Sequence, residues 1–357
     1  MGRTKARVAA VIAAACLIPT GLAACTASPT GQPSSGGSSA KADIVSLVDA
    51  SAKTAIDQLE STNGAPTGNS NIKLCYVTRT VSNEFWGYER AGFEAAAKKY
   101  GVQSQTFAVT DEASITEQLD KANSALKGGC SAILASPISA TALDSVFKVA
   151  LAQGIPAIIL NDAQGTVPGV VYVGPDALVI GKTAADYIAK QLPNGGKVAM
   201  VEGDPGSSNA LNRGKGFKAG LAAYPNLQLV ASATAKWDTN LAQTVAAGML
   251  TANPDIKAFY VQNDGMALGV QAAIAAKGLT GKVILVGTDG IPQAKLQIAA
   301  GDKGYTATVS ERPTTEGGAG VEAALWLLAG KKVAAWVDVP GILIDSSNVG
   351  QYPTGMP

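Results

Sequence analysis

Short apolar runs alternate with helix-like stretches along most of the chain, and each apolar run stops abruptly at polar residues. Ala258–Val261 is one such run. It ends at Gln262-Asn263-Asp264-Gly265, after which apolar residues recur at helical spacing as far as Ile274. This order predicts a buried strand, a polar turn and an amphipathic helix.

The same order repeats from Asn71 onward in two successive series. The predicted strands are Leu74–Val77, Ser104–Val109, Ala132–Ala135 and Ala157–Leu160, then Lys197–Val201, Leu227–Ala231, Ala258–Val261, Val283–Val286 and Thr306–Val309, with a last run at Val333–Val339. Strands that alternate with helices across short loops are typical of parallel sheets. We therefore expect an α/β fold of two doubly wound parallel-sheet lobes.

The first residues have the pattern of an export signal. Three basic residues precede the apolar run Val8–Ile18, and Leu22-Ala23-Ala24-Cys25 resembles a bacterial lipobox. The resemblance implies that residues 1–24 are a signal peptide, that Cys25 is lipidated, and that the protein is anchored on the outer face of the cytoplasmic membrane. The alternative is plain secretion with cleavage nearby.

The segment that follows reads as a tether. Thr26–Lys41 is rich in Ser, Gly, Pro and Thr, as flexible linkers are. Ala42–Leu59 has apolar residues at helical spacing, which predicts an amphipathic helix within a tether of residues 25–71.

Composition narrows the function. Hydrophobic residues make up 47% of the 357 residues and charged residues 15%, and the net charge is +1, so nothing indicates binding to nucleic acid. The sequence contains no His, which removes the commonest general base and the usual zinc ligand. We therefore expect neither an enzyme nor a cofactor. Gly317-Gly318-Ala319-Gly320 lacks the spacing of a phosphate loop and reads as close-packing glycines.

Besides Cys25, the predicted lipid site, two cysteines remain after the signal peptide: Cys75 and Cys130. For the cysteines we take the strands with their flanking residues: Cys75 lies in Lys73–Thr78, and Cys130 opens Cys130–Ala135. If these strands are neighbours, the stagger between the two residues is about 7–10 Å at the rise of a strand, which is beyond disulfide reach. We expect two buried free thiols.

Polar residues follow the predicted strands at the edge where open parallel sheets bind ligands. The set is Arg79, Asn83, Asn161, Asp162, Asn263, Asp289 and Glu311, and the aromatic residues Phe85, Trp86 and Trp237 lie in the same loops. Amides, carboxylates and a guanidinium can bind vicinal hydroxyls, and flat aromatic faces suit the C–H face of a sugar.

Local alternatives exist for several of these residues. Asn263 and Asp264 are both good helix caps. We expect Asp264 to cap the helix and Asn263 to contact ligand. Trp86 fits a stacking wall or core packing, and Asn209 and Arg213 fit ligand contacts or loop structure.

From about Lys73 to Val339 the chain resembles the ribose-binding-protein branch of the type I periplasmic binding proteins. The matching motifs are Ser82-Asn83-Glu84-Phe85-Trp86, Gly154-Ile155-Pro156-Ala157 with Asn161-Asp162, Asp186-Tyr187-Ile188-Ala189-Lys190, Arg213-Gly214-Lys215-Gly216-Phe217, Asn263-Asp264-Gly265-Met266-Ala267-Leu268-Gly269 and Val286-Gly287-Thr288-Asp289-Gly290. The combination is specific, although each motif alone is weak.

The resemblance implies roles for individual residues. Asn83, Phe85 and Trp86 match the polar and stacking residues of the first lobe. Trp237, Asn263, Asp289 and Glu311 match positions on the second lobe and near the hinge. Two positions depart from the family: Asn161-Asp162 replaces an Asp-Arg pair, and Leu211 replaces a sugar-binding Arg. A site with few cations argues against ribose and favours a polyol.

The implied function is substrate capture for an ABC importer, with a monosaccharide or sugar alcohol as ligand, a transporter permease as partner, and a monomeric state. A sensory receptor that acts with a membrane signalling partner is the alternative. The lobes are expected at residues 72–175 plus 311–339 and 176–310 plus 340–357. They would be joined by crossings near Gly174–Asp176, Ser310–Pro313 and Val339–Gly341, which would act as a hinge that closes on ligand.

Overall fold

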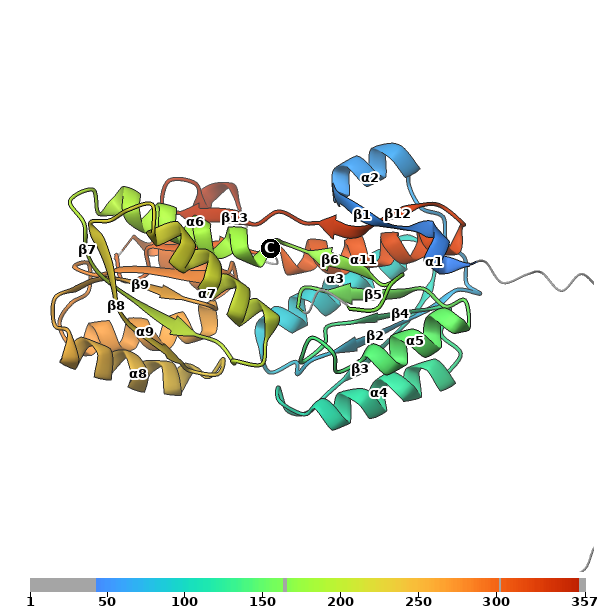
Figure 1. Cartoon of the computed structure of the whole chain (residues 1–357), viewed down its shortest axis with the longest axis horizontal. Coiled ribbons are helices and arrows are strands. Elements are labelled where there is room, and N and C mark those ends of the chain that lie inside the picture. The colour runs from blue at the N-terminus through green and yellow to red at the C-terminus, as the bar shows by residue number, and fades with distance from the viewer. Residues whose placement is uncertain (1–42, 163–165, 302, 353–357) are drawn as a thin grey trace, which may run out of the picture. The chain divides into compact units, whose positions relative to one another are not determined.

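The computed structural model describes residues 43–162, 166–301 and 303–352 (Figure 1). The predicted signal peptide, Cys25 and the Ser/Gly-rich linker lie outside these residues. Within the described ranges, each helix is too short or too polar to traverse a lipid bilayer.

The first sheet has seven strands, all parallel, in the order β1-β12-β6-β5-β4-β2-β3. Its strands are β1 Val48–Ala55, β2 Lys73–Thr78, β3 Gln103–Ala108, β4 Ala132–Ala135, β5 Ala157–Leu160, β6 Val171–Gly174 and β12 Val333–Asp338. Leu74 and Tyr76 of β2 face one core, whereas Cys75 and Val77 face the other. Helices therefore cover both faces of this sheet.

The second sheet has six strands in the order β13-β11-β10-β9-β7-β8. Its strands are β7 Gly196–Glu202, β8 Leu227–Thr234, β9 Ile256–Val261, β10 Ile284–Asp289, β11 Ala307–Ser310 and β13 Ile342–Asp345. The edge strand β13 runs antiparallel to β11, and the other neighbours are parallel. We call the halves around the two sheets the N-terminal and C-terminal lobes.

Each lobe places its helices in two layers. In the N-terminal lobe the helices are α1 Ile44–Leu47, α2 Ile56–Asn63, α3 Glu84–Lys99, α4 Ile115–Lys127, α5 Asp144–Ala152 and α11 Pro313–Leu328. In the C-terminal lobe they are α6 Ala177–Gln191, α7 Ser208–Leu221, α8 Thr239–Ala252, α9 Asp264–Ala276 and α10 Pro292–Ala300, with the 3₁₀ turn Val349–Gln351. These layers confirm the predicted doubly wound α/β class.

Within the described ranges, the chain passes between the sheets three times: between β6 and α6, between β11 and α11, and between β12 and β13. These passages coincide with the expected crossings. Glycines allow helices α3 and α11 to approach closely beside the second passage. A Cβ atom added at Gly317 would lie 2.0 Å from the Glu89 carbonyl oxygen, so this position requires glycine.

The predicted helix over Ala42–Leu59 is wrong. Residues 48–55 form strand β1, which pairs in parallel with β12 at the edge of the N-terminal sheet (Figure 1), and only short helices flank it. Apolar residues at Val48 and Ile56 fit the spacing of a helix as well as that of a strand. Pairing with β12, about 280 residues further along the chain, favours the strand.

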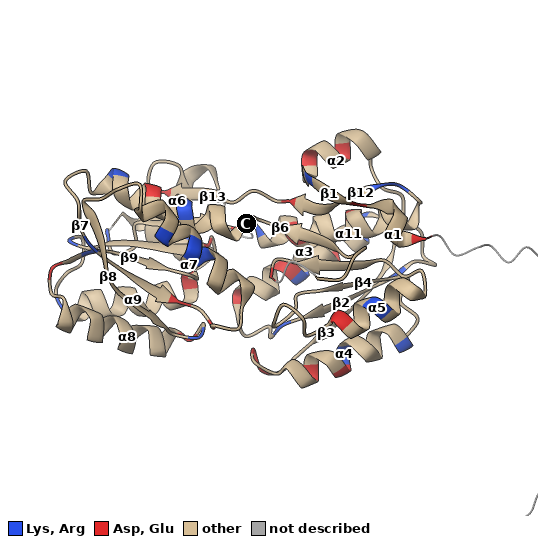
Figure 2. Ribbon diagram, in the orientation of Figure 1, with Lys and Arg blue, Asp and Glu red and all other residues tan. Residues whose placement is uncertain are grey.

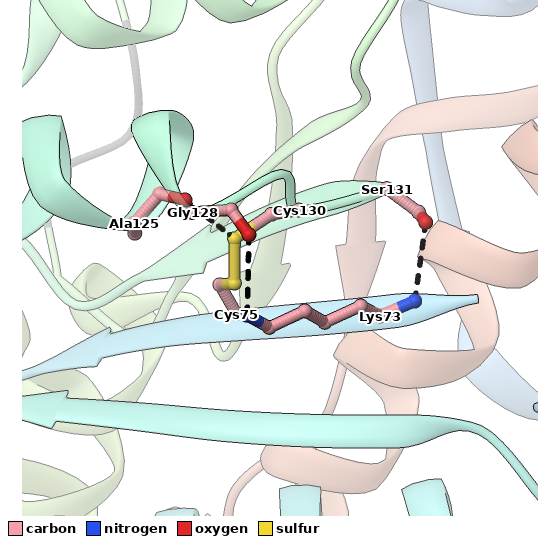
Figure 3. Close-up of a disulfide and its surroundings, with 6 residues drawn as sticks. All are labelled: Lys73, Cys75, Ala125, Gly128, Cys130 and Ser131. Carbon is pink, nitrogen blue, oxygen red and sulfur yellow. Dashed lines mark hydrogen bonds between the residues drawn. A yellow bond between two sulfur atoms is a disulfide. The ribbon is translucent and has the colours of Figure 1, made fainter. Parts of the chain in front are cut away.

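The prediction of free thiols is also wrong, because Cys75 and Cys130 form a disulfide. Strand β4 begins at Ala132, so Cys130 precedes the strand and does not open it. The preceding turn bends the chain back toward β2, where the backbone N of Ser131 donates to the Lys73 carbonyl oxygen at 2.7 Å. The rise of a strand therefore does not apply, and the two Cα atoms lie 5.8 Å apart (Figure 3).

Candidate functional site

One cavity is lined by all the predicted polar and aromatic site residues. The space between its walls is about 300 Å³, a volume that includes part of the open solvent. Its lining consists of Arg79, Asn83, Phe85, Trp86, Glu112, Asn161, Asp162, Asn209, Arg213, Trp237, Asn263, Asp289 and Glu311. Both lobes contribute, because these residues follow strands of both sheets at their carboxyl ends.

The start of helix α3 forms an aromatic wall. Asn83 caps the helix by accepting a hydrogen bond from the Phe85 backbone N at 3.1 Å. The Phe85 and Trp86 rings meet edge to face with centroids 4.8 Å apart. Trp86 Nε1 donates to Glu112 Oε1 at 2.8 Å, so this buried ring is held in one orientation while it lines the cavity.

Arg79 follows strand β2 and is the cation of the N-terminal wall. Its Nη2 lies 2.7 Å from Asp162 Oδ2, and its Nη1 lies 3.7 Å from Glu112 Oε1. The guanidinium lies over the Trp86 ring at 4.8 Å from the centroid. Because Arg79 is only 3% exposed, these partners are needed to offset the loss of water around the charge.

Asp162 joins the two lobes. Besides the Arg79 guanidinium, its carboxylate accepts from Ser207 Oγ at 2.7 Å and from the Asn209 backbone N at 2.9 Å. The two C-terminal-lobe donors lie at the N-terminus of helix α7, where the helix dipole favours a negative charge.

Asn161 also bridges the lobes, with backbone φ of 62°. Its Oδ1 accepts from Asn209 Nδ2 at 2.6 Å, and its Nδ2 donates to Glu311 Oε2 at 3.1 Å and to Glu316 Oε2 at 3.0 Å. The left-handed conformation is costly for a residue with a side chain, and such positions concentrate at functional sites. Asp289 and Trp237 share it, with φ of 118° and 67°.

Arg213 brings a second guanidinium to the cavity, from helix α7. Its Nη2 lies 2.5 Å from Glu311 Oε2, and its charge lies 5.9 Å from the centroid of the Trp237 ring. Arg213 Nε, Arg79 Nε and Glu311 Oε1 are buried and make no hydrogen bond within the described residues. Such groups are costly unless a partner satisfies them, and hydroxyls of a ligand could do so.

The capping role expected for Asp264 is wrong, because Asn263 holds that position. Asn263 caps helix α9 by accepting from the Met266 backbone N at 2.8 Å, and it also lines the cavity. Asp264 is fully buried and is the only charged residue on helices α8 and α9 (Figure 2). Its carboxylate accepts from the backbone N of Gly290 and Ile291 and from the hydroxyls of Tyr305 and Thr308, at 2.6–3.0 Å. The prediction failed by one position because both residue types are good caps.

Asp264 lies behind the cavity wall, close to Asp289, which lines the cavity. Burial raises the pKa of Asp264 to about 6, although its hydrogen-bond donors oppose the shift. Burial and the neighbouring Asp264 carboxylate raise the pKa of Asp289 well above its usual value, and Arg213 opposes this change. The backbone N of Asp264 donates to Asp289 Oδ2 at 3.3 Å, which fixes the Asp289 carboxyl at the cavity.

The premise that the site holds few cations is wrong. Leu211, which the resemblance placed at a sugar-binding Arg position, is 61% exposed and does not line the cavity. Arg213, two residues later on the same helix, does line it together with Arg79. Because two arginines line the cavity, a lack of cations no longer argues for a polyol over an aldose.

The predicted set lacks Glu112, and for Asn209 and Arg213 it left the choice between ligand contact and loop structure open. Glu112 follows strand β3 at the carboxyl edge that supplies the other residues, so its position was a usable signal. Asn209 and Arg213 lie within a helix, and the direction in which their side chains point depends on the packing of α7 against α6.

Comparison with known proteins gives a consistent result. A model of the periplasmic binding protein domain matches residues 74–332. The D-allose-binding periplasmic protein of Escherichia coli is 37% identical over 256 residues, which cover 69% of this chain and 81% of that protein. The ribose import binding protein of the same organism is 33% identical over 263 residues, covering 73% of this chain and 86% of that protein.

A solved structure has the same fold. It is a periplasmic solute binding protein of an ABC transporter from Actinobacillus succinogenes, solved with bound D-allose. The TM-score is 0.74 at 28% sequence identity, and the match covers 79% of this chain and 100% of that chain.

Proposed function

The chain belongs to the type I periplasmic binding proteins of the ribose-binding-like sugar branch, and on this premise we propose that it captures a monosaccharide or sugar alcohol for an ABC importer. The observation that carries the proposal is a cavity to which both lobes contribute, lined by guanidinium, carboxylate, amide and aromatic side chains. Paired donors and acceptors can bind vicinal hydroxyls, while Trp86, Phe85 and Trp237 supply apolar faces.

The ligand-bound state is the one in which the lobes touch. Asp162 and Asn161 of the N-terminal lobe already contact Ser207 and Asn209 of the C-terminal lobe. A ligand that contacts both walls stabilises this arrangement over one with separated lobes, so rotation at the three crossings closes the site. Export with a lipid anchor at Cys25 and delivery to a membrane permease complete the proposal.

Ligand screening tests the proposal directly. A ligand that binds only the folded protein raises its melting temperature, by an amount that grows with concentration. A panel of aldoses, including D-allose and D-ribose, and of sugar alcohols such as xylitol distinguishes the two ligand classes. If no member of the panel shifts the melting temperature at millimolar concentration, sugar capture is excluded for these ligands.

Substitutions in the C-terminal wall test the site. Asp289→Ala removes a carboxylate at the cavity, and Asn263→Ser removes the amide but keeps a hydroxyl that can cap helix α9. Each should weaken binding by about 10- to 100-fold, because a polar ligand loses a buried partner. Isothermal titration measures the affinity, and circular dichroism should show an intact fold. Wild-type affinity in both variants would contradict the assignment of the site.

A further inference from the structure

Strand β1 lies outside the part of the chain that matches the family model, which begins at residue 74. It lies beside β12 with Lys53 in register with Trp336, and β12 leads directly into the third crossing between the lobes. An N-terminal segment therefore reaches the hinge.

The Lys53 ammonium group contacts two carboxylates that belong to different crossings. Its Nζ lies 3.2 Å from Asp176 Oδ2 and 3.6 Å from Asp338 Oδ1. Asp176 follows the first crossing and caps helix α6 of the C-terminal lobe, where its Oδ1 accepts from the Leu178 backbone N at 3.0 Å. Asp338 ends β12 of the N-terminal lobe, just before the third crossing. Lys53 thus connects the two lobes electrostatically at the hinge.

The surroundings of Lys53 hold its side chain at this junction. Its Nζ lies 3.7 Å from the centroid of the Trp336 ring, a cation–π geometry. Trp336 Nε1 donates to the Gly174 carbonyl oxygen at 3.0 Å, and the Val339 backbone N donates to the same oxygen at 3.3 Å. The first and third crossings are therefore tied together directly below Lys53.

Without Lys53 the junction would hold two like charges. Burial raises the pKa of Asp338, the Lys53 cation lowers it, and the nearby Asp176 carboxylate raises it again. Loss of the cation would leave Asp176 and Asp338 to repel each other, and rotation of helix α6 away from β12 would relieve that repulsion.

We propose that Lys53 is a positioning residue of the hinge: by bridging Asp176 and Asp338 it favours the arrangement in which the lobes touch and ligand is held. The inference rests on the proposed function for its consequence on binding, whereas its consequence on lobe position is independent of any ligand.

Three variants test the role of Lys53. Lys53→Met keeps the aliphatic stem and removes the charge, and Lys53→Arg keeps the charge. Lys121→Met is the matched control, because Lys121 forms an ion pair with Glu117 within helix α4, away from the hinge. Small-angle X-ray scattering of the ligand-free protein, with the N-terminal segment present, should give a larger radius of gyration for Lys53→Met than for the wild type. The other two variants should match the wild type.

Titration with D-allose gives the second measurement. The dissociation constant of Lys53→Met should be about threefold higher than that of the wild type at low salt, since partly exposed ion pairs are individually weak. The difference should shrink in high salt, which a purely structural defect would not show. A radius of gyration and affinity equal to the wild type would overturn the inference. If the wild type does not bind D-allose, that sugar is excluded as the ligand, and the scattering comparison still decides the role of Lys53.

Discussion

Glu89 and Glu316 are a buried carboxyl pair directly behind the candidate site. Glu89 lies on α3 and Glu316 on α11, and both are fully buried. Glu89 Oε2 accepts from Ser136 Oγ at 2.7 Å and from the Tyr76 hydroxyl. Burial raises the pKa of Glu89 to about 7, and burial together with the Glu89 and Glu311 charges raises the pKa of Glu316 well above its usual value. Burial therefore favours the protonated form of both carboxyls.

The raised pKa values predict how stability changes with pH. A carboxyl whose pKa is higher in the folded than in the unfolded state stabilises the fold at low pH, and this contribution is lost as the pH rises through the folded value. For Glu89 the window runs from its ordinary value of 4.5 to about 7. We expect Glu89→Gln to be as stable as the wild type at pH 5 and more stable by about 1–3 kcal/mol at pH 8.

Urea unfolding at the two pH values measures this difference. Glu94→Gln is the control, because Glu94 lies on the same helix with half of its side chain exposed. An equal stability difference between Glu89→Gln and the wild type at both pH values would show that Glu89 does not titrate in this window.

The residue types of the site could be predicted from the sequence, but their exact roles could not. Polar residues that follow buried strands must gather at one sheet edge, which is why Asn161, Asp289 and Arg79 line the same cavity. Whether Asn263 or Asp264 caps the helix depends on where the helix begins, and the two possible starts differ by one residue. The direction of Arg213 depends on helix packing, which local sequence does not encode.

Individual elements were predictable where burial is complete. Strands β2, β4, β5 and β9 are nearly continuous apolar runs, and the structure confirms each within two residues of the predicted bounds. Strand β1 is an edge strand with mostly exposed or half-buried residues, so its local pattern carries little information about its partner. Interactions distant in sequence decide such elements.

The disulfide is a staple between two elements of the N-terminal lobe. It links β2 to the residue two positions before β4 and closes a loop of 55 residues. Next to it, the backbone N of Lys73 donates to Ser131 Oγ at 3.1 Å, and Lys73 Nζ donates to the Gly128 carbonyl oxygen at 3.2 Å (Figure 3). Disulfides persist in oxidising compartments, which agrees with the export expected for this family.

Removal of the disulfide should lower stability without affecting the cavity. Closing a loop of this length stabilises a protein by about 4 kcal/mol in the chain-entropy estimate, and measured values are often 2–4 kcal/mol. We expect a double substitution, Cys75→Ala with Cys130→Ala, to lower the free energy of unfolding by about 2–4 kcal/mol. Guanidinium unfolding measures the loss. An unchanged free energy of unfolding would mean that the disulfide does not stabilise the fold.

Asp162 couples the two lobes through side-chain contacts. It accepts from Ser207 and Asn209 of the C-terminal lobe while it pairs with Arg79 of its own lobe. Asp162→Asn replaces one acceptor oxygen by a donor that faces the Arg79 guanidinium. We expect at least about tenfold weaker sugar binding, since charged hydrogen bonds contribute about 1.5–3 kcal/mol.

The loss should arise mainly from faster dissociation, because weaker lobe contacts shorten the lifetime of the closed state. Stopped-flow release of a bound sugar measures the rate. Asp204→Asn is the control, because Asp204 lies in the loop that leads to Ser207 and its carboxylate accepts from the Gly206 backbone N at 2.7 Å, within its own lobe. Equal release rates in the wild type and Asp162→Asn would exclude the coupling.

The order of strands in the N-terminal sheet has a consequence for how the chain folds. β12 lies between β6 and β1, so β1 has no sheet to join until residues 333–338 have arrived. Contacts between segments so distant in sequence form slowly, because a long loop must close first. Strand β1 is therefore expected to pair late in folding. A truncated chain that stops before residue 333 would therefore leave β1 without its partner strand in the sheet.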